Sequence, residues 1–202
     1  PDALALKKAV VNVKNADEQC FKWAVLSALF PAGKDAQRVG KYKERAGELD
    51  WGGLEFPVKL DKIPLFERRN SVSVNVYGWD EKQKAAHLLQ KSKMGEAAER
   101  HIDLLLLEQD SQSHFCWIKS FSRFARQPSD YGHQKKHYCH YCLHGFPSAA
   151  KLAEHLKCGC REITEARPVL PEPGAKDAFV EFKSPEKQHK APFVIYADFE
   201  AL

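Results

Sequence analysis

Four of the six cysteines lie with histidine in one short window, and this feature constrains the fold more than any other. Cys139 and Cys142 are separated by two residues, and His155 follows with two further cysteines close behind it. This is metal-ligand spacing, because a cysteine pair and a nearby histidine supply the donors of a tetrahedral site. Cys160 is separated from His155 by four residues and Cys158 by two. The usual spacing is about three to five residues, so we favour Cys160 as the fourth ligand, with Cys158 the alternative.

Residues 138–160, "YCHYCLHGFPSAAKLAEHLKCGC", resemble the ββα zinc finger, whose hairpin and helix enclose a structural Zn²⁺. Phe146 and Leu152 fall where the small core of that finger requires apolar residues. The resemblance implies Zn²⁺ held by Cys139, Cys142, His155 and Cys160, with His140 and His144 left on the surface. The helix "SAAKLAEHLK" has two lysines, which predicts a structural or docking role rather than base reading. The preceding "HQKKH" predicts weak contact with phosphate.

The stretch "KNADEQCFKWAVLSALFP", residues 14–31, predicts a helix, because its apolar residues recur at helical spacing until Pro31. With Asp17 as the N-cap, Cys20 falls in the first turn, where backbone N–H groups favour a thiolate. A cysteine hydrolase also needs a histidine from the sheet, and His114 opens the strand "HFCWI". The pattern therefore predicts Cys20 as nucleophile and His114 as general base, with Gln19 beside the cysteine as an oxyanion donor. In the alternative interpretation, Cys20 is a half-buried core thiol and His114 binds backbone.

The remaining elements predict an α+β fold in which one helix leads and an antiparallel sheet follows. Residues 7–15 predict a short strand, and residues 47–64 a structured loop. Val72, Val74 and Val76 alternate with polar residues, which predicts a half-buried strand. Residues 101–109 predict a buried strand, and residues 114–124 a further strand.

The phrases "DEQCFKWAVLSAL" and "SHFCWI" are similar to the cysteine helix and histidine strand of ovarian-tumour deubiquitinases. Viral tegument-type deubiquitinases share the same broad papain-like fold. The resemblance implies a papain-like cysteine protease over residues 1–130 that acts on ubiquitin or a ubiquitin-like protein. Ovarian-tumour enzymes often carry a polar residue two positions after the histidine, where this chain has Cys116; tegument-type enzymes carry an aspartate two positions before it, where this chain has Gln112. Two alternatives stay open: a Cys–His dyad without a third residue, or an orienting residue from elsewhere such as Asp110 or Asp130.

The final segment "FVIYADFEAL" sets Asp198 and Glu200 two residues apart and resembles the first exonuclease motif of family B DNA polymerases. In order, the segments resemble the region upstream of the polymerase in proteins of Polinton or Maverick transposons. This implies four parts: a protease domain over 1–130, a zinc finger over 137–160, a linker over 161–190 and a truncated exonuclease start over 191–202. The missing downstream ligands imply that these residues alone are neither exonuclease nor polymerase.

The formal net charge of +4 permits a polyanionic partner without requiring one. No run approaches the roughly 18 apolar residues of a membrane span, and cysteine use suits a reducing compartment, so we expect an intracellular protein of cytoplasm or nucleus without membrane contact. The rival function is a non-catalytic accessory module of the polymerase that binds DNA or a protein primer. The basic stretch "KSFSRFAR", residues 119–126, supports that alternative.

Overall fold

The computed structural model describes residues 2–94, 98–109, 112–127 and 135–160. The predicted linker over 161–190 and the exonuclease-like segment over 191–202, with Asp198 and Glu200, lie outside these residues. Asp110 and Asp130, the two alternatives for a third catalytic residue, also lie outside them.

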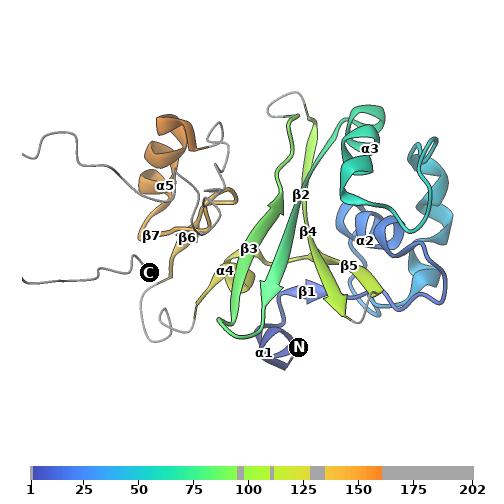
Figure 1. The fold of residues 1–202 in the computed structure, drawn as a ribbon, viewed down its shortest axis with the longest axis horizontal. Helices are drawn as coiled ribbons and strands as arrows, with labels where there is room; N and C mark the ends of the chain where they lie inside the picture. Colours follow the sequence, from blue (N-terminus) through green and yellow to red (C-terminus); the bar gives the residue numbers. More distant parts are fainter. Residues whose placement is uncertain (1, 95–97, 110–111, 128–134, 161–202) are drawn as a thin grey trace, which may run out of the picture. The chain divides into compact units, whose positions relative to one another are not determined.

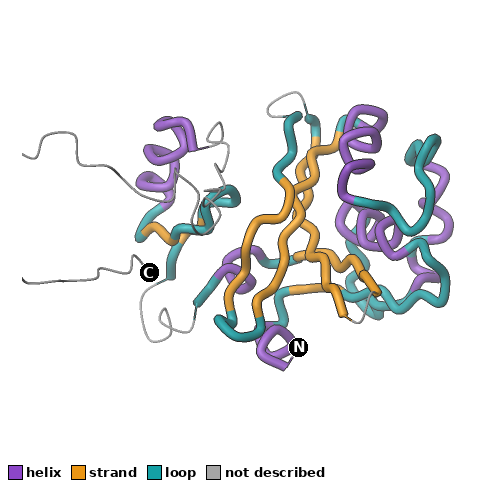
Figure 2. Tube along the Cα trace, in the orientation of Figure 1, coloured by secondary structure: helices purple, strands orange, loops and turns teal. Residues whose placement is uncertain are grey.

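A five-stranded sheet in the order β1-β5-β4-β2-β3 forms the centre of the fold (Figures 1 and 2). Its strands are β1 (Val10–Val11), β2 (Val72–Asp80), β3 (Ala85–Gln90), β4 (Arg100–Gln109) and β5 (Gln112–Ile118). The expected antiparallel sheet is wrong at one pair, because β2 and β4 are parallel. β3 forms a hairpin with β2 and occupies one edge of it. β4 therefore pairs with the other edge of β2, and it runs in the same direction as β2. The class is α+β with a mixed sheet.

Two helices cover one face of this sheet (Figure 1). They are α2 (Cys20–Leu29) and α3 (Ile63–Asn70). Phe21 of α2 is fully buried and meets the rings of Phe66 and Phe115 edge-on, with centroids 5.5 and 5.3 Å apart. Val72, Val74 and Val76 complete this core from β2.

The opposite face carries α1 (Asp2–Lys7) and α4 (Phe121–Ala125) around a second core. Tyr77 and Phe124 are fully buried there. β2 is therefore covered on both faces, and the expectation of a half-buried strand is wrong: Ser73 and Asn75, its polar residues, are 5% and 0% exposed. Buried polar groups need hydrogen-bond partners. Asn75 Nδ2 donates to the Tyr77 hydroxyl at 3.3 Å and Asn75 Oδ1 accepts from the N–H of Ser92 at 3.0 Å, while the network that Ser73 joins is described below.

Two further corrections concern helices. A short helix, α1, precedes α2, so α2 does not lead the fold. The strand expected over residues 114–124 ends at Ile118, because the N–H groups of Lys119 and Ser120 both donate to Ala9 O and turn the chain into α4. The loop over residues 47–64 contains short 3₁₀ turns and leads into α3, whose first turn accommodates Pro64.

The last described segment is a small hairpin followed by a helix, here called the ββα unit (residues 135–160). It comprises β6 (His137–Tyr138), β7 (Gly145–Phe146) and α5 (Ala149–His155), continued by a turn over Leu156–Cys160. Ser148 caps α5 by accepting a hydrogen bond from the N–H of Lys151. Gly159 adopts a φ of 83°, and this left-handed residue turns the chain so that Cys160 returns toward the hairpin.

In the described part of the chain, no helix has both the length and the apolar character needed to cross a bilayer.

Candidate functional site

Cys20 is the first residue of α2, at the helix end that presents free N–H groups. The N-cap position belongs to Gln19, whose carbonyl accepts the N–H of Trp23. The expected N-cap, Asp17, lies further back. Its Oδ1 accepts from Gln19 N–H at 3.0 Å and from Trp23 Nε1–H at 3.1 Å, so it fixes the approach to the helix instead.

The Asp17 carboxylate is stable as the charged form. Burial raises its pKa, but hydrogen bonds from Asn15, Gln19 and Trp23 outweigh that effect, and the pKa is lowered overall. Gln19 is half-buried, and within the described residues its side-chain amide has no hydrogen-bond partner. That amide is therefore free to bind an oxygen near Cys20.

The thiol of Cys20 is 6% exposed, and its Sγ lies 4.0 Å from the carbonyl oxygen of Ser113. Ser113 immediately precedes His114 on β5, so the start of α2 lies against the start of this strand. The structure does not form a hydrogen bond between Cys20 Sγ and the His114 ring. Cys20 packs with Phe115 in the core on the α2 face, whereas His114 shares the register face of Cys116, which packs in the core on the opposite face.

His114 has a polar partner of its own. Its Nε2 lies 2.9 Å from Asn12 Oδ1, across 102 residues of sequence. An amide oxygen only accepts hydrogen bonds, so this contact places the proton of neutral imidazole on Nε2 and leaves a lone pair on Nδ1. Burial lowers the pKa of His114, which keeps the ring neutral near pH 7.

Asn12 is the candidate site residue that sequence reasoning missed. It follows β1, whose Val10 and Val11 pair with Ile118 and Trp117 of β5, and the same register carries Asn12 toward His114. The available signal was Asn12 itself, a polar residue between the apolar Val11 and Val13 of the predicted strand. Without the β1–β5 pairing, nothing in the sequence connected Asn12 to His114.

Cys116, two residues after His114 on β5, is a poor candidate to orient the His114 ring. Burial, with the nearby Cys20, raises the pKa of Cys116 to about 12. A fully buried neutral thiol is a weak hydrogen-bond acceptor, and it does not stabilise an imidazolium as a carboxylate or amide does.

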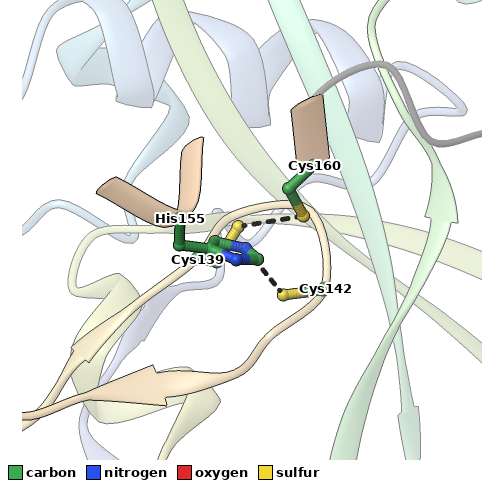
Figure 3. Close-up of side chains that lie close together, drawn as sticks. All are labelled: Cys139, Cys142, His155 and Cys160. Atoms are coloured by element: carbon green, nitrogen blue, oxygen red, sulfur yellow. Dashed lines mark hydrogen bonds between the residues drawn. The ribbon is translucent and has the colours of Figure 1, made fainter. Parts of the chain in front are cut away.

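A second site lies in the ββα unit, where four side chains converge (Figure 3). Cys139 and Cys142 come from the loop between β6 and β7, His155 from α5, and Cys160 from the turn after it. Cys139 Sγ lies 3.8 Å from Cys160 Sγ, and Cys142 Sγ lies 3.4 Å from His155 Nε2. All four ligand atoms lie within 4.8 Å of one another, so the cluster has the donors and spacing to hold a metal ion. Cys158 is exposed and outside the cluster.

Hydrogen bonds close the loop around this cluster. The N–H of Tyr141 donates to Cys139 Sγ at 3.4 Å, and Cys139 N–H and Leu143 N–H close the loop through the carbonyls of His144 and Cys139. Without a cation, burial and the neighbouring thiols raise the pKa of Cys160 to about 12. A divalent ion between the sulfurs would reverse that preference.

A buried polar network joins the ββα unit to the sheet. Asp103 of β4 is 7% exposed, and its two oxygens lie 3.0 Å from His101 Nε2 and 2.8 Å from His140 Nδ1. Tyr77 donates its hydroxyl to His140 O at 2.6 Å, and Ser73 Oγ lies 2.6 Å from His101 Nδ1. His140 was expected on the surface and is instead half-buried and bonded to Asp103; His144 is exposed, as expected.

No protein-family model, curated protein or solved structure matches this chain in the three comparisons made.

Proposed function

We propose that this protein is a cysteine-dependent hydrolase of peptide or isopeptide bonds, with a papain-like arrangement of Cys20 and His114. The observation that carries the proposal is the 2.9 Å contact between His114 Nε2 and Asn12 Oδ1, next to Ser113, whose carbonyl oxygen lies 4.0 Å from Sγ of the helix-terminal Cys20. A nucleophile at a helix N-terminus, a neutral histidine and a group that orients it are the parts that thiol catalysis needs.

In the proposed reaction, His114 Nδ1 takes the proton from Cys20 Sγ as sulfur attacks the substrate carbonyl carbon. The tetrahedral intermediate collapses to a thioester, and His114 gives the proton to the departing amine. Water then attacks the thioester with His114 again as base, which releases the acid and restores the thiol. Asn12 is a positioning residue, because its oxygen holds the ring through Nε2 and leaves Nδ1 free.

The reaction requires a rearrangement at the start of β5 that brings His114 Nδ1 to Cys20 Sγ, because the two side chains make no hydrogen bond in this conformation. The 4.0 Å contact of Cys20 Sγ with Ser113 O is long and thiols donate weakly, so losing that contact itself costs little. Candidate oxyanion donors are the backbone N–H of Cys20 and the side-chain amide of Gln19, which has no other partner among the described residues.

We further propose that the ββα unit is a zinc finger. Zn²⁺ would be held by Cys139, Cys142, His155 and Cys160, with a structural role, because all four positions are filled by protein ligands. Phe146 packs against the His155 ring with centroids 4.7 Å apart and supports the ligand orientation.

The substrate class is ubiquitin or a ubiquitin-like protein, a proposal that rests on the phrases similar to ovarian-tumour deubiquitinases. The test is hydrolysis of ubiquitin carrying a C-terminal fluorescent amide by the full chain. We expect turnover that Cys20→Ala and His114→Ala both abolish, while Cys158→Ala, which removes an exposed thiol elsewhere, retains it. Turnover that survives Cys20→Ala would contradict the proposal.

A further inference from the structure

Two basic segments that are separate in sequence border one surface hollow of about 500 Å³, here called the cationic hollow. Arg123 and Arg126 come from α4 and the residue after it, and Lys135 and Lys136 come from the start of the ββα unit. The rest of the described lining is Ser120, Ser122 and Tyr138, so no described acidic side chain borders the hollow.

The fold holds α4 with its polar side toward this hollow. Phe124 and Ala125 are 0% and 5% exposed and anchor the helix against the sheet, while Ser122 and Arg123 are exposed. The Lys7 ammonium donates to Phe124 O at 2.8 Å and to Arg126 O at 2.6 Å, so the end of α4 is fixed. Phe121 stacks on His140 with ring centroids 3.8 Å apart, which joins α4 to the ββα unit.

The lining chemistry favours phosphodiester groups. Arginine, lysine and serine hydroxyls are the side chains that proteins use most at nucleic-acid phosphates. The volume of the hollow lies within the range of about 300–1,000 Å³ typical of ligand sites. The hollow is therefore larger than one inorganic phosphate ion. Tyr138, the single aromatic residue in the described lining, is 6% exposed, so no described residue offers an open ring on which a base stacks.

We propose that the cationic hollow binds the phosphate backbone of nucleic acid without sequence preference, through the exposed Arg123 and Lys135. This site uses neither Cys20 nor His114 and goes beyond the proposed hydrolase activity. With two phosphates neutralised on duplex DNA by Arg123 and Lys135, the slope of log affinity against log salt is about −2. Affinity then falls about tenfold between 50 and 200 mM salt.

The experiment measures fluorescence anisotropy of labelled 20-nucleotide mixed-sequence DNA, single-stranded and duplex, with the zinc-loaded full chain. The test variant carries Arg123→Glu and Lys135→Glu, two exposed positions of the hollow. The control variant carries Lys59→Glu and Lys93→Glu, which make the same charge change at exposed positions outside it. Circular dichroism confirms that both variants fold.

We expect the hollow variant to bind DNA at least tenfold more weakly and the control variant to stay within twofold of wild type. Hydrolysis by Cys20 should be unchanged in both, which separates this proposal from the proposed function. An absence of DNA binding by wild type, or equal losses in the two variants, would overturn it. Displacement of DNA by inorganic phosphate at constant ionic strength would also overturn the proposal. Binding of poly-glutamate or of anionic-lipid vesicles as tight as that of DNA would overturn it as well.

Discussion

The contact between Asn12 and His114 sets a testable requirement on a single side chain. Replacement by Asn12→Ala removes the acceptor at His114 Nε2, and the ring then loses its fixed tautomer and orientation. We expect kcat/KM for ubiquitin amide hydrolysis to fall by about 10- to 100-fold, the range seen when groups that orient a histidine are removed. Steady-state kinetics on folded variants measure this loss.

The Asn12→Asp variant supplies the control. The aspartate in this variant keeps a hydrogen-bond acceptor at the same place, so its activity should be close to that of wild type and well above that of Asn12→Ala. The negative charge of the new carboxylate should raise the pKa of His114. The acidic limb of the pH–rate profile should therefore move to higher pH. Equal rates for wild type and Asn12→Ala would mean that Asn12 is only a surface partner of His114.

Asp103 shows how a buried carboxylate links stability to pH. Burial raises its pKa, but hydrogen bonds and positive charge from His101 and His140 outweigh this and lower the pKa from 3.8 to about 2. A folded pKa below the unfolded value contributes stability above about pH 4, and that contribution is lost as pH falls toward 2. The shift corresponds to about 2 kcal/mol.

We therefore expect Asp103→Asn to lower the free energy of unfolding by about 2 kcal/mol at pH 6. The difference from wild type should shrink between pH 4 and pH 2, as urea titrations across that interval would measure. A difference that stays constant down to pH 2 would show that the Asp103 charge does not stabilise the fold.

At the scale of elements, the turn after α5 decides which cysteine completes the metal cluster. Gly159 in its left-handed conformation returns Cys160 to the hairpin and leaves Cys158 exposed. Elemental analysis of purified protein should find one zinc per chain in wild type and in Cys158→Ser. Cys160→Ser should lose most of its zinc after brief dialysis against a mild chelator. The reverse pattern would assign the fourth position to Cys158.

Some elements are predictable from sequence because local patterns determine them. The apolar spacing of residues 21–29 predicts α2, and the alternation of Val72, Val74 and Val76 predicts β2. The parallel pairing of β2 with β4 is not local, because both strands are apolar enough to pair in either direction. α4 was also missed: backbone hydrogen bonds to Ala9, remote in sequence, end β5 and start this helix.

Some residues of the candidate sites can likewise be predicted from local sequence, and others cannot. The cluster of Cys139, Cys142, His155 and Cys160 follows from short-range spacing, so sequence is enough to select it. Cys20 at the helix start also follows from local pattern. The partner of His114 does not, because Asn12 reaches it only through the pairing of β1 with β5.

At the scale of the described chain, the ββα unit and the sheet differ in how much core supports them. In residues 135–160 only three side chains are buried: Tyr138, Cys139 and Cys160. The α2 side of the sheet has a much larger apolar core, with Phe21, Val25 and Leu26 fully buried. We therefore expect a metal ion at the four-residue cluster to contribute to the stability of this unit.

Removal of metal should therefore destabilise the ββα unit and leave the sheet and α2 intact. With a strong chelator, hydrogen exchange should lose protection over residues 137–160 while α2 and β5 stay protected. Adding zinc back should restore the protection over residues 137–160. Equal loss over α2 would show that the core between α2 and the sheet also depends on metal.

The most direct test of the proposed hydrolase is covalent capture of its nucleophile. The full chain is incubated with ubiquitin that carries a C-terminal thiol-reactive warhead, and peptide mass spectrometry locates the adduct. We predict one adduct, on Cys20, which persists in Cys158→Ala, disappears in Cys20→Ala and forms slowly in Asn12→Ala. An adduct on another cysteine, or no adduct with wild type, would contradict Cys20 as the nucleophile of a deubiquitinase.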